Sequence, residues 1–528
     1  MPTHPHRTTS SLVGLCPALP TALCRLALAL LVLTVVAPAE AATTFPTDCG
    51  LHPNDCAGVA LANRYGTNGL NDNPRRFNPA VHPPVEKMFR VTMDLQTYPD
   101  AMCNDGSPAV FYFAAAPAGS INADNWVIQL EGGGSCLSAQ DEDGLHQDCM
   151  DRWTGRGPDR LDYPRKMSTD LDGDGVVDLA FLPLEGRVPG LLGAASVVTD
   201  PTDNGGADAW NRLYLNYCSS DLWRGRSGSQ VLDDGEWTDA AGGTQIYEPL
   251  DNAYFHGHWI LDNILDAVAA GVTSDDGDHF LRLDTTPDKV VLAGESAGGG
   301  GVIANLDYLA GKALWGDGVT KGVAGATTVP PLAYDDVAIP WYTGPQTVQE
   351  WDLSVPVLVD VDLDANGVID THDREAGTAL RRNVYETILD AFVDQSCAAA
   401  NTDPLAPDPN QRHWLCHTAV PLFEDGHITT EILIKQDLAD SVMSAGIPAF
   451  GEGVRTTMGS TPANFYYFGP KCGHHETLSN TSRFKGDRVT DPVVGRTVSY
   501  HTAIAEFIDG LYTSIYHQPG VTIRSCAP

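Results

Sequence analysis

One short segment near the middle of the chain constrains the fold most: an apolar run, KVVLAG, leads directly into ESAGGGG. Lys289–Ala293 predicts a buried strand, and Gly299–Leu309 predicts the start of a helix. A Gly-x-Ser-x-Gly pattern alone is weak, because a chain with 52 glycines should hold about 0.3 accidental matches. The strand and helix around it make Ser296 a candidate nucleophile, with glycines at 294 and 298 letting the two elements approach closely. A purely structural glycine-rich turn is the alternative.

Other apolar runs predict strands that alternate with helical patterns. The expected strands, besides the one before Ser296, are Ala109–Ala115, Trp126–Leu130, Arg212–Asn216, Val355–Val359 and Glu431–Lys435. Apolar residues at 3.6-residue spacing between Trp259 and Ala269 predict a helix. This alternation implies an α/β fold with a mostly parallel sheet and helices on both faces. No linker or repeat divides the chain, so we expect one enlarged domain, 101–528, after a loop-rich lead-in, 42–100.

The N-terminal segment, residues 1–41, has the pattern of an export signal. Leu26–Val36 is an apolar stretch of signal-core length, and Ala39-Glu40-Ala41 offers a small-x-small cleavage site. No later stretch has the 18 uninterrupted apolar residues typical of a membrane span. We therefore expect a secreted protein, extracellular or periplasmic, in which the ten cysteines after the signal form up to five disulfides.

The net charge excludes some partners. The chain carries 32 basic and 68 acidic residues, a formal net charge of −36. Such a surface repels nucleic acid phosphates and anionic lipid, so neither is expected to bind.

Several motifs together resemble one family, the pectin acetylesterases and Notum esterases. The matching segments are CNDGSPAVFYF (103–113), WVIQLEGGGSC (126–136), WNRLYLNYCSSDLWRG (210–225), AYFHGHWILDNIL (253–265), VVLAGESAGGGGVIANLDYLA (290–310) and CGHHE (472–476). The resemblance implies an α/β-hydrolase-like fold, a Ser-Asp-His triad with Ser296 as nucleophile, and cleavage of acyl esters without a redox or organic cofactor.

The base is expected to follow the nucleophile, because this fold carries its triad in the order Ser, acid, His. The family motif is Cys-x-x-His, and Cys472-Gly473-His474-His475 matches it. The resemblance therefore implies that His475 is the base. His474 is the main alternative.

The acid has several candidates. In the family it follows a strand and precedes the start of a helix, a form that TEILIKQDLADSV (430–442) shares. Alignment of that strand implies Asp440, and Asp437 is the second choice. Glu424 and Asp425 in PLFEDG are further alternatives.

An oxyanion hole is expected from main-chain N–H groups. Family positions imply Gly133 and Gly134 in LEGGGSC, together with Ala297 after the nucleophile. A plain tight turn is the alternative for the glycines. The family usually has a tryptophan beside them where this chain has Ser135, so its acyl-chain preference does not carry over. The family also implies a disulfide between Cys136 and Cys149.

Two acidic segments have the ligand spacing of calcium loops. DLDANGVIDTHD (362–373) is the stronger, and DLDGDGVVD (170–178) lacks an oxygen ligand at loop position 12, where Phe181 stands. We expect structural calcium in insertions near 165–185 and 355–380, with an acidic surface turn as the alternative. The proposed ligands are Asp362, Asp364, Asn366, Val368, Asp370, Asp373, Asp170, Asp172, Asp174, Val176 and Asp178.

Together these features predict an exported serine esterase that acts on acyl esters, most simply short acetyl-type esters, of carbohydrate or similar extracellular material. The expected partner is thus an ester substrate such as an acylated polysaccharide. One alternative is a deacylase of longer-chain esters, as in the Notum branch. Another is a catalytically dead extracellular binding protein. The sequence does not give the oligomeric state.

Overall fold

The structure is a computed structural model of the chain, and the residues that it describes belong to one compact unit, Phe45–Pro528. The described residues are 88–104, 106–116, 119–120, 122–135, 210–232, 236–238, 244–246, 250–275, 277–283, 287, 289–312, 319–325, 388–400, 416, 422, 426–440, 464–475, 477–478, 481–490, 496–508 and 516–517.

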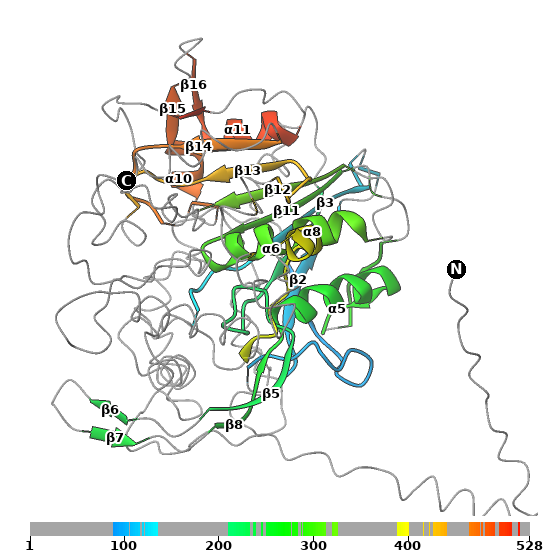
Figure 1. Cartoon of the computed structure of the whole chain (residues 1–528). Helices are drawn as coiled ribbons and strands as arrows, with labels where there is room; N and C mark the ends of the chain where they lie inside the picture. The colour runs from blue at the N-terminus through cyan, green and yellow to red at the C-terminus, as the bar shows by residue number, and fades with distance from the viewer. Residues whose placement is uncertain are drawn as a thin grey trace, which may run out of the picture. The chain divides into compact units, whose positions relative to one another are not determined.

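A nine-stranded sheet forms the centre of the fold (Figure 1). Its order is β1-β2-β4-β3-β11-β12-β13-β14-β17. The strands are β1 (Phe89–Thr92), β2 (Val110–Ala114), β4 (Asn211–Leu215), β3 (Asn125–Leu130), β11 (Lys289–Glu295), β12 (Val319–Gly325), β13 (Ile432–Lys435), β14 (Phe465–Gly469) and β17 (Tyr516–His517). Strand β2 pairs antiparallel with both of its neighbours, and the other pairs are parallel.

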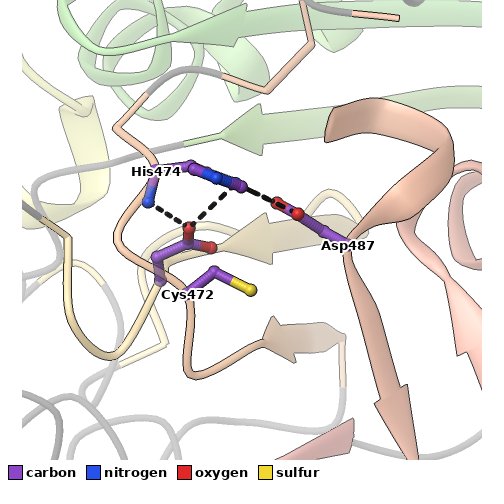
Figure 2. A group of neighbouring side chains, drawn as sticks. Cys472, His474 and Asp487 are labelled. Atoms are coloured by element: carbon purple, nitrogen blue, oxygen red, sulfur yellow. Dashed lines mark hydrogen bonds and ion pairs between the residues drawn. The ribbon is translucent and has the colours of Figure 1, made fainter. Parts of the chain in front are cut away.

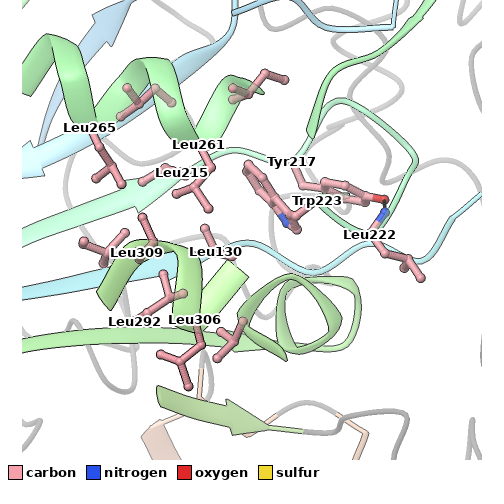
Figure 3. Packing of buried hydrophobic residues seen from close by; sticks show 14 of the residues in the cluster. Leu130, Leu215, Tyr217, Leu222, Trp223, Leu261, Leu265, Leu292, Leu306 and Leu309 are labelled. Carbon is pink, nitrogen blue, oxygen red and sulfur yellow. Dashed lines mark hydrogen bonds between the residues drawn. The ribbon is translucent and has the colours of Figure 1, made fainter. Parts of the chain in front are cut away.

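The central strands are buried on both faces because successive side chains of a strand point to opposite sides. In β11, Leu292 joins the apolar cluster that contains Leu261 and Leu306, whereas its neighbour Val291 joins the cluster that contains Phe507. Figure 3 shows the first cluster, in which leucines of the helices α5 and α6 pack on leucines of the sheet. Helices therefore cover both faces of the sheet.

The helices are α5 (Gly257–Ala270), α6 (Ala297–Gly311), α8 (Gln395–Ala400), α10 (Thr481–Gly486) and α11 (Tyr500–Ile508). The described residues also form four two-stranded sheets: β5 (Ser227–Leu232) with β8 (Leu250–Phe255), β6 (Glu236–Thr238) with β7 (Thr244–Ile246), β9 (Val272–Thr273) with β10 (Phe280–Leu281), and β15 (Arg488–Thr490) with β16 (Thr497–Ser499). Among the described residues, no helix is long and apolar enough to span a bilayer.

The predicted fold class is confirmed: the sheet is mostly parallel, helices cover it, and the strand-serine-helix turn lies at its centre, as in an α/β-hydrolase. Five of the six predicted strands correspond to β2, β3, β4, β11 and β13, and the predicted helices correspond to α5 and α6. The sixth predicted strand, Val355–Val359, lies outside the described residues. Strands β1, β12, β14 and β17 of the central sheet were not predicted.

Two disulfides join described cysteines, which supports the prediction that this chain uses its cysteines as crosslinks. Cys103 pairs with Cys218, and Cys397 pairs with Cys416. The first bond joins the segment before β2 to the loop after β4, 115 residues along the chain, so it fixes a loop beside the candidate site. The proposed Cys136–Cys149 pair lies outside the described residues.

Candidate active site

Ser296 lies on a sharp turn between β11 and α6. Its φ of 55° and ψ of −125° place a non-glycine residue in a backbone conformation that L residues rarely adopt. The turn is tight: a Cβ on Gly294 would lie 2.3 Å from the carbonyl oxygen of Gly298, and a Cβ on Gly298 would lie 2.2 Å from that of Leu130. Only glycine fits at either position, so the sequence forces the serine into this elbow.

His475 and Asp440 complete a hydrogen-bonded chain that starts at Ser296. The Nε2 atom of His475 lies 2.8 Å from Ser296 Oγ. On the other side of the ring, Nδ1 lies 3.0 Å from Asp440 Oδ2 and 3.1 Å from Oδ1. Asp440 follows β13 and is fully buried, and His475 follows the neighbouring strand β14. Because parallel strands end at the same edge of a sheet, the three side chains converge there.

The alternative candidates make different contacts. Asp437 Oδ2 accepts a hydrogen bond of 2.8 Å from the main-chain N–H of His474, and Asp437 Oδ1 lies 2.7 Å from the ammonium of Lys435. The ring of His474 faces Asp487, at 3.0 Å from both carboxylate oxygens (Figure 2). Among the contacts between described residues, neither Asp437 nor His474 touches the Ser296 hydroxyl. Glu424 and Asp425 lie outside the described residues.

Asp437 belongs to a buried cluster with Asp487, His474 and Cys472, whose donor atoms lie within 4.8 Å of one another. Two facts argue against a metal ion there. The Lys435 ammonium already lies 2.7 Å from Asp437 and 3.8 Å from Asp487, and Cys472 is in a disulfide and cannot offer a thiolate.

Burial raises the pKa of Asp437 to about 6, against the lowering effect of the nearby Lys435.

The glycine-rich loop after β3 lies against the start of α6, where the oxyanion hole is expected. A Cβ on Gly298 would lie 2.9 Å from the carbonyl oxygen of Glu131 as well as against Leu130, so this loop touches the first turn of the helix that Ala297 begins. Gly134 has a φ of 70° and Gly133 a φ of 151°, conformations that glycine adopts without strain.

Two groups hold this loop in place. The side chain of Glu131 accepts hydrogen bonds from Tyr217 N at 2.9 Å and from Asn216 Nδ2 at 3.2 Å. The main-chain oxygen of Glu131 accepts a hydrogen bond of 2.9 Å from the indole N–H of Trp223. The loop after β4 thus fixes the loop after β3.

Sequence reasoning missed the residue that organises the loop after β4. Asp221 is fully buried, and its carboxylate accepts hydrogen bonds from the Ser219 hydroxyl and from the main-chain N–H groups of Trp223, Gly225 and Gly257, at 2.6 to 3.0 Å. Burial raises its pKa, and these hydrogen bonds oppose that rise. Its sequence signal is the single acidic residue of the motif CSSDLWRG, whose other residues include two serines and Arg224.

The remaining proposed site residues lie outside the described part of the chain. These are the ligands of both calcium loops, Asp362, Asp364, Asn366, Val368, Asp370, Asp373, Asp170, Asp172, Asp174, Val176 and Asp178, and the pair Cys136 and Cys149. Their roles stay predictions.

Comparison with known proteins finds similarity to carboxylic ester hydrolases. The family model described as Pectinacetylesterase matches residues 86–173. A palmitoleoyl-protein carboxylesterase NOTUM of Schmidtea mediterranea is 28% identical over 245 residues, 46% of this chain and 34% of that protein. The chain is thus similar to the pectin acetylesterases and to the Notum carboxylesterases.

Other Notum relatives are more distant. The palmitoleoyl-protein carboxylesterase NOTUM of Homo sapiens is 24% identical over 39% of this chain and 29% of its own length. The chain thus spans about a third of the curated relatives that it matches. Two crystal forms of the Wnt deacylase Notum from Drosophila align with 80% of this chain and 93% and 94% of theirs, at 19% and 18% identity and a TM-score of 0.46.

Proposed function

We propose that this chain is an exported serine esterase that hydrolyses acyl esters, with Ser296, His475 and Asp440 as its catalytic triad. The observation that carries the proposal is the continuous chain of hydrogen bonds from Asp440 through His475 to Ser296. Similarity to the pectin acetylesterase model and to Notum carboxylesterases supports it. The N-terminal signal pattern and the disulfides support export.

The proposed reaction uses no metal or organic cofactor. Ser296 Oγ attacks the acyl carbon while His475 Nε2 takes its proton, and Asp440 stabilises the imidazolium and holds Nδ1 protonated. The N–H groups of Gly133, Gly134 and Ala297 stabilise the oxyanion of the tetrahedral intermediate. The C–O bond to the alcohol breaks, and His475 returns the proton to the departing oxygen. Water then attacks the acyl-serine in the same way and releases the carboxylic acid.

For the substrate, we propose short acetyl-type esters of carbohydrate, such as an acylated polysaccharide. The match to the pectin acetylesterase model supports this choice. A deacylase of longer-chain esters is the second candidate, because the curated relatives are palmitoleoyl-protein carboxylesterases.

A panel of p-nitrophenyl esters of increasing acyl length, followed by acetylated polysaccharides and a palmitoleoylated peptide, tests the proposal. Wild type should hydrolyse the short esters, and Ser296→Ala should lose at least about 10³-fold in kcat while it stays folded. A covalent serine probe should label Ser296 alone. Preference for long chains would favour the second candidate. Wild type that neither hydrolyses any ester nor reacts with the probe would indicate a binding protein.

A further inference from the structure

Glu295 is a buried carboxylate at the end of the nucleophile strand, directly before Ser296. It is 2% exposed. Its Oε2 atom accepts hydrogen bonds from two successive main-chain N–H groups, of Thr477 at 2.6 Å and of Leu478 at 2.7 Å. These residues lie on the loop that carries His475, about 180 positions along the chain from Glu295. One residue therefore ties the loop of the base to the strand of the nucleophile.

The other side of the same loop is held independently. Asp437, at the end of β13, accepts the main-chain N–H of His474 at 2.8 Å. His475 thus lies between two anchored segments, His474 on one side and Thr477–Leu478 on the other. Of the two anchoring residues, Asp437 and Glu295, only Glu295 is bonded directly to Ser296. Glu295 alone therefore links the position of the nucleophile to that of the His475 loop.

This anchoring should affect the reaction rate through the position of the His475 imidazole. Ser296 Oγ and His475 Nε2 are 2.8 Å apart, and a displacement of about 1 Å at a reacting group can cost about 100-fold in rate. Burying a carboxylate is costly unless its oxygens find donors, and two donors to Glu295 are the amides of the base loop.

We propose that Glu295 is a positioning residue that holds His475 at hydrogen-bonding distance from Ser296 by accepting the N–H groups of Thr477 and Leu478. The inference rests on the proposed function. The proposal requires an oxygen acceptor at the distance that the glutamate side chain spans. Shortening the side chain should therefore lower kcat more than removing its charge does.

Three substitutions distinguish the effect of side-chain length from that of charge. Glu295→Gln keeps an oxygen acceptor on a side chain of the same length but removes the charge. Glu295→Asp keeps the charge on a side chain that is one methylene shorter, and Glu295→Ala removes the acceptor. The matched control is Asp307→Ala, because Asp307 also accepts two successive main-chain N–H groups, of Thr429 at 2.8 Å and of Thr430 at 3.0 Å, but does not touch the base loop.

Two measurements are made on each variant: kcat and KM with a short p-nitrophenyl ester, and native-state hydrogen exchange at Thr477 and Leu478. In Glu295→Ala and Glu295→Asp we expect kcat to fall by about 10- to 100-fold with KM changed by less than about twofold, together with loss of protection at both amides. Glu295→Gln should keep most of the activity and protection. Asp307→Ala should lower the melting temperature but leave kcat within about twofold.

Several results would overturn the inference. One is a kcat of Glu295→Ala equal to that of Asp307→Ala. Another is unchanged protection of the Thr477 and Leu478 amides in Glu295→Ala. A third is a Glu295→Gln variant that is as impaired as Glu295→Ala while Glu295→Asp stays active. If the Ala variant does not fold, the Gln and Asp variants decide alone. If wild type hydrolyses no ester, the proposed function fails, whereas the exchange comparison still decides whether Glu295 holds the loop.

Discussion

Asp437 and Asp440 leave the same strand three positions apart and face different histidines. Asp440 lies 3.0 Å from the ring nitrogen of His475, whereas Asp437 accepts the main-chain N–H of His474. The two carboxylates are both fully buried, but only one orients a ring that contacts Ser296. This separation of contacts gives each aspartate a distinct expected effect on the reaction.

Asparagine at the two positions should therefore act differently. Asp440→Asn leaves the shape of the site but no longer stabilises the imidazolium, so kcat should fall by about 10³- to 10⁴-fold. Asp437→Asn keeps an oxygen that can accept the His474 N–H, so its kcat should stay within about tenfold of wild type. Steady-state kinetics on one short-chain ester measure both. Equal losses, or a larger loss at Asp437, would contradict the assignment of the acid.

Much of this site follows from local sequence. The strand before Ser296 and the glycines around it define the elbow, because a strand, a sharp turn and a helix each have a short-range signature. His475 and Asp440 were implied by the family resemblance, and the fold brings both into one hydrogen-bonded chain with Ser296. Parallel strands that end at one edge explain why residues after β11, β13 and β14 meet.

The supporting residue Glu295 was not predicted, because the amides that it accepts are 182 and 183 positions away. Asp221 accepts N–H groups of nearby Trp223 and Gly225, and also that of Gly257, 36 positions away. Strand β12 was missed for a related reason: its segment, VTKGVAG, contains a lysine and two glycines, which weaken a strand signal. In the fold, Lys321 pairs with Glu431 and lies over the ring of Phe507 at 4.7 Å, so its charge is accommodated.

The glycine-rich loop offers a second test. Gly134→Ala places a side chain where φ is 70°, which should displace main-chain donors of the proposed oxyanion hole and lower kcat by about 10²-fold or more. Gly277→Ala is the matched control, because Gly277 has a φ of 80° and no atom within 4 Å of the added methyl group. Both variants should lose a similar amount of stability, about 1 kcal/mol. If both keep wild-type kcat, the loop does not supply the donors.

Calcium should stabilise the protein without entering the reaction. The segment 362–373 carries Asp362, Asp364, Asp370 and Asp373, carboxylates that repel one another unless a cation lies between them. Calcium at a hundredfold excess over its Kd would add about 2.7 kcal/mol. Melting curves with calcium and with chelator, paired with initial rates well below the melting temperature, measure the two effects. An unmoved melting temperature would mean that the segment is an acidic turn. Rate loss with an intact fold would contradict a metal-free mechanism.

His258 should make the protein sensitive to acid. This histidine is buried on α5, where its Nδ1 lies 2.7 Å from Asn305 Oδ1 and its ring stacks on Phe392 with centroids 3.9 Å apart. Burial lowers its pKa to about 4, although Asp262 acts in the opposite direction and Arg226 and Lys312 add to the lowering. The imidazole is therefore neutral in the folded protein at neutral pH.

The sign of the effect follows from proton linkage. The unfolded chain, with a histidine pKa near 6.5, takes up a proton as the pH falls below that value, whereas the folded protein does not until about pH 4. Stability contributed by neutral His258 is thus complete above pH 6.5 and is lost between pH 6.5 and 4, by about 3 kcal/mol in total. His258→Gln can still donate to Asn305 but cannot titrate. Urea unfolding from pH 7 to pH 4 should show it less stable than wild type at pH 7 and less steeply weakened by acid. Parallel pH profiles for the two proteins would show that His258 does not titrate in this range.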